Sequence, residues 1–112
     1  MYVFAVPIPP GKTDAVRRLT DECLGPRKAE YDDLQRRGGV AVESYWLQHA
    51  PEGGDTLIVV SDSDQHAFAE IFANPQTEFD RWYREQILDI FGVDLAEPWG
   101  PRNEMLGEWR AG

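Results

Sequence analysis

Five side chains that could take part in chemistry lie close together in the stretch 40–61. They are Glu43, Tyr45, Trp46, Gln48 and His49. Burial among apolar neighbours raises the pKa of a carboxyl group unless a cation pairs with it, which is how a general base near neutral pH is made. Glu43 is therefore a candidate base for withdrawing a proton from an acidic C–H. The alternatives are an ion pair with a nearby arginine or a site that faces water.

The stretch that carries these residues is typical of a β-hairpin. One strand ends near His49, a loop rich in glycine and proline follows, and a second, almost entirely apolar strand comes next. Successive side chains of a strand point to opposite faces. Glu43, Tyr45 and His49 thus share one face, and Trp46 and Gln48 share the other. The five side chains cannot all line one pocket unless a bulge changes the register.

Further candidates come from the rest of the chain. A pocket with aromatic walls and a few polar groups suits a flat organic ligand. The candidate ligand-binding residues are Glu30, Tyr31, Trp46, Gln48 and Trp82, and His66 joins Glu43 as a candidate catalytic residue. For both tryptophans the alternative role is a place in the hydrophobic core.

The sequence favours neither a metal site nor a cofactor. His49 and His66 are the two histidines, they fall on separate elements, and a metal site needs about three ligands with matched geometry. No glycine-rich phosphate loop, nucleophile elbow or cysteine cluster is present. The single cysteine, Cys23, lies beside Asp21 and Glu22 on a helical pattern, which predicts a buried thiol and not a reactive one.

Length and charge limit the possible partners. The 112 residues fit one domain, 1–112, with one core. The net charge is -9, so a nucleic-acid role is not expected, because binding phosphate needs a basic face. No apolar run approaches the roughly 20 residues of a membrane span, and the first residues lack the basic region of a signal peptide. We therefore expect a cytoplasmic protein that does not enter a membrane.

The order of predicted elements is β, α, β, β, α, β, with breaks inside both helical regions. This is the ferredoxin-like order of an α+β protein, in which helices cover one face of an antiparallel sheet. The last strand is predicted over Glu104–Arg110. The strands over 2–8 and 56–60 are apolar on both faces, so the second face of the sheet also needs a cover. The simplest cover is a second copy packed about a two-fold axis, which predicts a homodimer.

With this order of elements, the run GGVAVESYWLQHAPEGGDTLIVV, followed by FDRWYREQILDIFGVDL, resembles the dimeric α+β barrels. The closer resemblance is to an uncharacterised branch related to antibiotic-biosynthesis-type monooxygenases. It implies a homodimer formed through the open sheet face and a pocket between sheet and helices. Relatives that degrade heme carry an asparagine on the first strand, and none stands there in this chain, so heme degradation is not expected.

Three functions are consistent with these residues. The first is binding of a small organic molecule, aromatic or polyketide-like, between sheet and helices. The second is a cofactor-independent monooxygenase or isomerase with Glu43 as base, inside aromatic walls that exclude water. The third is a structural or regulatory dimer whose core is filled and has no pocket. The sequence leaves open whether the protein is an enzyme.

Overall fold

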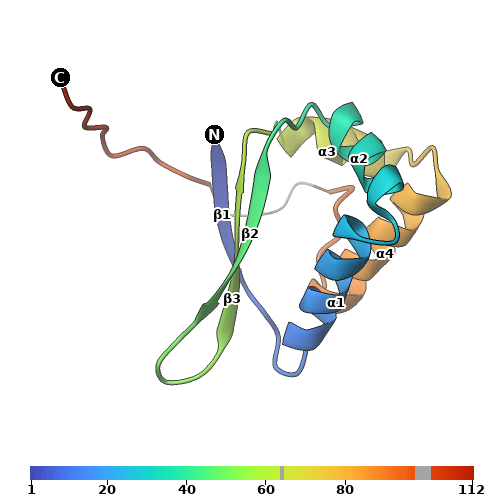
Figure 1. The fold of residues 1–112 in the computed structure, drawn as a ribbon, viewed down its shortest axis with the longest axis horizontal. Helices are drawn as coiled ribbons and strands as arrows, with labels where there is room; N and C mark the ends of the chain where they lie inside the picture. Colours follow the sequence, from blue (N-terminus) through green and yellow to red (C-terminus); the bar gives the residue numbers. More distant parts are fainter. Residues whose placement is uncertain (64, 98–101) are drawn as a thin grey trace.

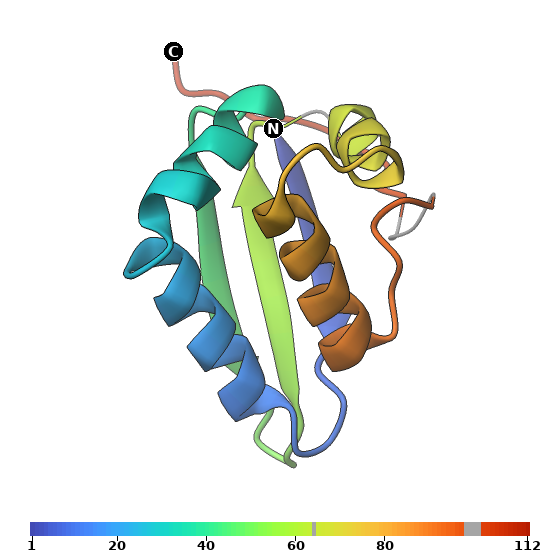
Figure 2. The ribbon, with the colours of Figure 1, turned by 90° about the vertical axis from the view of Figure 1, so that its right-hand side faces the viewer.

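The computed structural model describes residues 1–63, 65–97 and 102–112. These residues form an α+β fold of two layers, an antiparallel sheet and a layer of helices on one of its faces (Figures 1 and 2). In chain order the elements are β1 (Tyr2–Pro7), α1 (Thr13–Leu24), α2 (Lys28–Arg37), β2 (Glu43–His49), β3 (Asp55–Ser61), α3 (Gln65–Ala73) and α4 (Glu78–Phe91). Among these helices, none is long and apolar enough to cross a membrane.

The sheet has the order β1-β3-β2, so that the most apolar strand lies in the centre, as its sequence predicts. Val59 on β3 lies opposite Phe4 on β1 and Tyr45 on β2. These three side chains share the inner face, which points toward the helices. One residue earlier on β3, Ile58 lies opposite Trp46, and both belong to the outer face. The strand register is regular, so the two faces alternate as predicted.

The outer face of the sheet is left open in the single chain. It carries no charged side chain along the paired strands; its residues are Val3, Ala5, Pro7, Ser44, Trp46, Gln48, Thr56, Ile58 and Val60. Trp46 is 61% exposed and Val3 is 42% exposed. A solvated sheet face normally carries polar side chains, so an uncharged outer face marks a surface suited to contact.

The hydrophobic core lies mainly between the helices. One buried cluster joins all four helices and consists of Cys23, Tyr31, Leu34, Phe72 and Phe79. A smaller cluster joins Ile8, Val16 and Ile90. The buried members of both clusters lie outside the strands. On the inner face of the sheet Val59 is buried, and Tyr45, Leu47 and Leu57 pack against the two clusters while remaining partly exposed. Space remains between the two layers, and it forms the candidate site.

Local signals explain where the helices begin and end. Thr77 caps α4 by accepting a hydrogen bond from the backbone N–H of Asp80, and the Asp80 side chain accepts from the backbone N–H of Thr77 in return. Gly92 ends α4 in the left-handed region at φ 71°, which glycine adopts without strain. α1 begins without a side-chain cap. Thr13 is its first residue, and the Thr13 hydroxyl donates to Asp55 Oδ2 at 2.6 Å.

The predicted last strand, Glu104–Arg110, is not formed in the single chain. Residues 102–112 form neither helix nor strand, and they extend beyond the sheet on the side opposite the helices (Figure 1). Asn103 donates a side-chain hydrogen bond to the backbone carbonyl of Val3 on β1, and the chain then leaves the sheet edge. A segment with alternating apolar residues forms a strand only where a neighbouring strand hydrogen-bonds to it. The last β of the predicted order is therefore not formed here.

Candidate functional site

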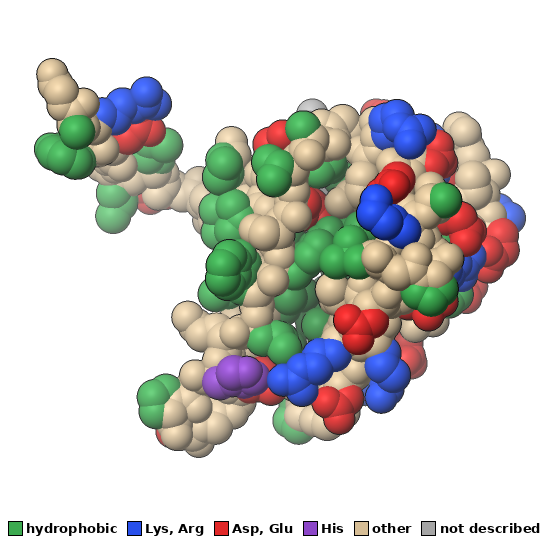
Figure 3. All heavy atoms as spheres, viewed as in Figure 1, with side chains coloured by type: hydrophobic (Ala, Val, Ile, Leu, Met, Phe, Trp, Pro, Cys, Tyr) green, Lys and Arg blue, Asp and Glu red, His purple; other side chains and the backbone are tan. Residues whose placement is uncertain are grey.

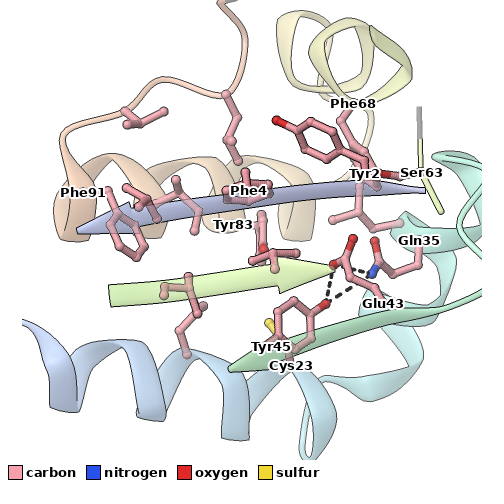
Figure 4. Close-up of a pocket in the computed structure, with 18 of the residues that line it drawn as sticks. Tyr2, Phe4, Cys23, Gln35, Glu43, Tyr45, Ser63, Phe68, Tyr83 and Phe91 are labelled. Carbon is pink, nitrogen blue, oxygen red and sulfur yellow. Dashed lines mark hydrogen bonds between the residues drawn. The ribbon is translucent and has the colours of Figure 1, made fainter. Parts of the chain in front are cut away.

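A cavity of about 770 Å³ lies between the inner face of the sheet and the helices. Figure 3 shows the hollow between the two layers, and Figure 4 shows the side chains around it. All three strands and all four helices contribute to its wall. Its aromatic lining residues are Tyr2, Phe4, Tyr31, Tyr45, Phe68, Phe72, Tyr83 and Phe91. Aliphatic side chains such as Val16, Leu57 and Ile87 complete an apolar wall.

A cluster of polar side chains lies at one end of the cavity (Figure 4). Glu43 and Tyr45 stand two residues apart on β2 and therefore share its inner face. Tyr31 and Gln35 stand one helical turn apart on α2 and therefore share one side of that helix. The packing of α2 over β2 brings the two pairs together.

All hydrogen bonds to the Glu43 carboxylate within this cluster reach one oxygen atom. Oε1 accepts from Tyr45 Oη at 2.5 Å, from Gln35 Nε2 at 3.0 Å and from Tyr31 Oη at 3.4 Å. The hydroxyls of Tyr31 and Tyr45 also hydrogen-bond to each other. Among the described residues, no side chain or backbone group donates to Oε2. Within the described part of the chain, that oxygen is therefore an unused acceptor on a residue that lines the cavity.

The ion-pair alternative for Glu43 is not found among the described residues. Arg36 lies 3.9 Å from Asp33, and Arg37 binds Asp80 with both terminal nitrogens, at 2.9 and 2.6 Å. No lysine or arginine of the described chain forms an ion pair with Glu43. Within the described residues the Glu43 carboxyl group is held by neutral donors alone.

Burial keeps the neighbouring tyrosines neutral. It raises the pKa of Tyr31 and of Tyr45 well above the usual value, and the adjacent ionisable groups, Glu43 among them, add to the rise. Tyr83, stacked against Phe72, also has a strongly raised pKa because it is buried. These phenols therefore act as hydrogen-bond donors to the carboxylate and not as bases.

The buried thiol was predicted correctly. Cys23 is 2% exposed, and burial raises the pKa of its thiol to about 12. A protonated thiol at the cavity wall behaves as a small apolar side chain.

Of the predicted site residues, the structure brings Glu43 and Tyr31 together at the cavity. Trp46 and Gln48 lie on the outer face of the sheet, because they alternate with Glu43 on β2. Trp46 thus belongs neither to the core nor to the cavity. His49 shares the inner side, yet it lies at the far end of β2, where its Nδ1 is 2.6 Å from Asp55 Oδ1.

The remaining predicted residues lie elsewhere. Glu30 is exposed on α2 and pairs with Arg27 at 2.9 Å. Trp82 packs against Phe79 and under the Arg27 guanidinium, 4.4 Å from its ring centre, on the helix side of the core. His66 belongs to α3, but its side chain lies outside the described part of the chain.

Sequence reasoning missed Gln35 and the inner face of β1. Gln35 follows Tyr31 by four residues, so the helical period alone places them on one side. Tyr2 and Phe4 alternate with exposed Val3 and Ala5, and this alternation indicates that Tyr2 and Phe4 belong to the cavity wall.

The described residues contain no group of three or more His, Cys, Asp or Glu side chains able to hold a metal ion.

Comparison with known proteins gives no match: no family model, no curated protein and no solved structure matches this chain. The resemblance to the dimeric α+β barrels therefore stays a prediction from the order of elements. The structure itself defines an α+β protein with an open three-stranded sheet in its described residues and a cavity under the helices.

Proposed function

We propose that this protein binds a small, flat organic molecule, aromatic or polyketide-like, between its sheet and its helices. The observation that carries the proposal is the cavity of about 770 Å³, with aromatic walls and one polar cluster. Small-molecule sites typically have volumes of about 300–1,000 Å³ and combine a mostly apolar wall with a few polar groups. The volume also disfavours the alternative of a dimer with a filled core.

The polar cluster defines the ligand's polar end. Glu43 Oε1 is already engaged by Tyr45 and Gln35, while Oε2 has no donor among the described residues. A ligand with an O–H or N–H group would satisfy it, and such a charge-assisted hydrogen bond is roughly twice as strong as a neutral one. A carboxylate ligand would be repelled. The expected ligand is therefore neutral and aromatic and carries a phenol, enol or amine group.

Matched coumarins test this proposal. We expect 7-hydroxycoumarin to bind at least about tenfold more tightly than 7-methoxycoumarin, and coumarin-3-carboxylate to bind weakest, by calorimetry and thermal shift. Glu43→Gln should remove most of the preference for the hydroxyl, whereas Glu52→Gln, in the exposed hairpin loop, should leave it unchanged. If neither coumarins nor larger aromatic polyketides bind at millimolar concentration, the proposal is wrong.

A second candidate function is a cofactor-independent monooxygenase or isomerase. It is favoured by a Glu43 that lines the cavity without an ion pair among the described residues. Oε2 would take the proton of an acidic C–H. In an isomerase the proton returns to another carbon of the same substrate. In an oxygenase the carbanion reduces O₂, so that a CH₂ group becomes a ketone and water leaves.

Proton exchange separates catalysis from binding. A ligand bound in D₂O should exchange its acidic C–H for C–D, as followed by proton NMR, in the native chain but not in Glu43→Gln. Equal exchange in both proteins would remove Glu43 as the base. Binding without exchange in either protein would leave ligand binding as the function.

We also propose a homodimer formed through the outer face of the sheet. Two chains of net charge -9 repel each other, but this face carries no charge along its paired strands, so the repulsion is least there. Light scattering should give a molecular mass of twice the 12.8 kDa of one chain. Trp46→Lys would place two cations in the interface and should yield a monomer, whereas Leu88→Lys, on the exposed side of α4, should not. A monomeric native chain would overturn the dimer.

A further inference from the structure

The segment 104–112, here called the C-terminal arm, has apolar side chains that are almost fully exposed to solvent. Met105 is 76% exposed, Leu106 is 93% exposed and Trp109 is 85% exposed. Figure 3 shows hydrophobic side chains on a segment that stands clear of the body of the protein. Isolated exposed apolar residues are ordinary, but three within five residues of an extended segment indicate a docking element.

The arm leaves the body at a place that directs it away from its own helices. Asn103 binds the carbonyl of Val3 on β1, and β1 is an edge strand of the sheet. From there the arm passes to the side of the outer face, opposite the helical layer (Figure 1). Nine extended residues span about 30 Å, which is enough to cross a sheet of this size. The arm therefore projects into the space that a second chain on the outer face would occupy.

The outer face is the surface that such an arm fits. It is uncharged along the paired strands, and Trp46, Val42 and Val3 on or beside it are all more than 40% exposed. One chain thus carries both an arm with exposed apolar side chains and a sheet face without charges along its paired strands. In a two-fold dimer each copy supplies one arm and one sheet face, so the contact between arm and sheet is formed twice.

We propose that two copies of this chain exchange their C-terminal arms, each arm packing Leu106 and Trp109 against the sheet of the other copy. This inference rests on the proposed dimer and adds to it the element that holds the dimer together. Asn103 and Arg102 line the cavity, so the exchanged arm begins at the cavity wall.

Isotope-mixed photocrosslinking tests the exchange directly. The chain with benzoylphenylalanine in place of Trp109 is prepared in ¹⁴N and ¹⁵N forms, mixed, equilibrated and irradiated. Mass spectrometry should find arm peptides of one isotope joined to β1 or β2 peptides of the other. Crosslinks confined to peptides of the same isotope would show that the arm folds back on its own chain, and would overturn the proposal.

Arm variants separate this inference from the dimer itself. Leu106→Ser combined with Trp109→Ser should raise the dimer dissociation constant at least about tenfold in analytical ultracentrifugation. The matched control, Leu88→Ser on α4, should not change it. An unchanged constant in the arm variant would overturn the exchange and leave the dimer standing. A native chain that stays monomeric at 100 µM would overturn both.

Discussion

The hydroxyl of Tyr45 donates a hydrogen bond of 2.5 Å to Oε1 of Glu43, two residues earlier on β2. The same oxygen receives the amide of Gln35 from α2. This arrangement turns one carboxylate oxygen toward donors of the protein itself and leaves the other without a donor among the described residues. It makes the polar end of the cavity an acceptor site, and it ties β2 to α2 across the gap between the two layers.

The hydrogen bond between Tyr31 and Tyr45 should couple the stability effects of their substitution. Tyr31→Phe and Tyr45→Phe should each lower the free energy of unfolding by about 1 kcal/mol, because each removes a partly buried hydrogen bond. The double variant should lose less than the sum, with a coupling of about 0.5–1.5 kcal/mol. Urea denaturation of the four proteins measures this. Strict additivity would show that the hydroxyls act independently.

The Arg37–Asp80 pair should be the most important ion pair for stability. Asp80 is 0% exposed and accepts two hydrogen bonds from Arg37. Asp80→Asn should lower the free energy of unfolding by about 3 kcal/mol, because Arg37 then loses the charge that balances it. Asp14→Asn, which removes the exposed pair with Arg17, should change it by less than about 0.5 kcal/mol. Equal effects of the two substitutions would contradict this prediction.

The same pair should make stability depend on pH in the acidic range. Burial alone would raise the pKa of Asp80, but the hydrogen bonds from Arg37, Thr77 and the backbone of Gln76, together with the Arg37 charge, outweigh it and hold the pKa below its usual value. The unfolded chain binds this proton more tightly than the folded one. The stabilisation is thus complete above the ordinary aspartate pKa of about 3.9 and is lost as the pH falls through the lower, folded value. The stability difference between native and Asp80→Asn chains should shrink below about pH 4 in urea titrations.

The Cys23 thiol should be almost inert in the folded protein. Its pKa is raised to about 12 by burial, so hardly any thiolate forms at pH 8, and its side chain is buried. Reaction with Ellman's reagent at pH 8 should be more than about hundredfold slower in the folded chain than in 6 M urea. A folded chain that reacts within seconds would show that the cavity opens freely to reagents.

Gly38 should resist even a single added methyl group. A Cβ at this position would lie 2.4 Å from the ring of Phe68, which lines the cavity, while its own backbone is in an ordinary region at φ -79°. Gly38→Ala should destabilise the fold by about 1–3 kcal/mol through this overlap, as measured by thermal unfolding. A stable Gly38→Ala chain would mean that Phe68 moves freely within the cavity.

What could be predicted from the sequence is local. Strand alternation alone placed Glu43 with Tyr45 and opposite Trp46, and the apolar run of β3 predicted the central strand. The helical pattern around Cys23 placed its thiol inside. These features depend on residues a few positions apart, where backbone geometry dictates direction.

Only the tertiary structure decided which of these local faces meet. The approach of α2 to β2 brought Tyr31 and Gln35 to Glu43, and it left Trp82 and Glu30 away from the cavity. The cavity exists because the helices and the sheet are held apart. The periodic pattern of apolar residues in the sequence contains no information about that distance. The strand predicted over Glu104–Arg110 shows the same limit. The alternation of its apolar residues is local, but a strand forms only beside the edge of another strand. Tertiary packing decides whether such an edge lies within reach.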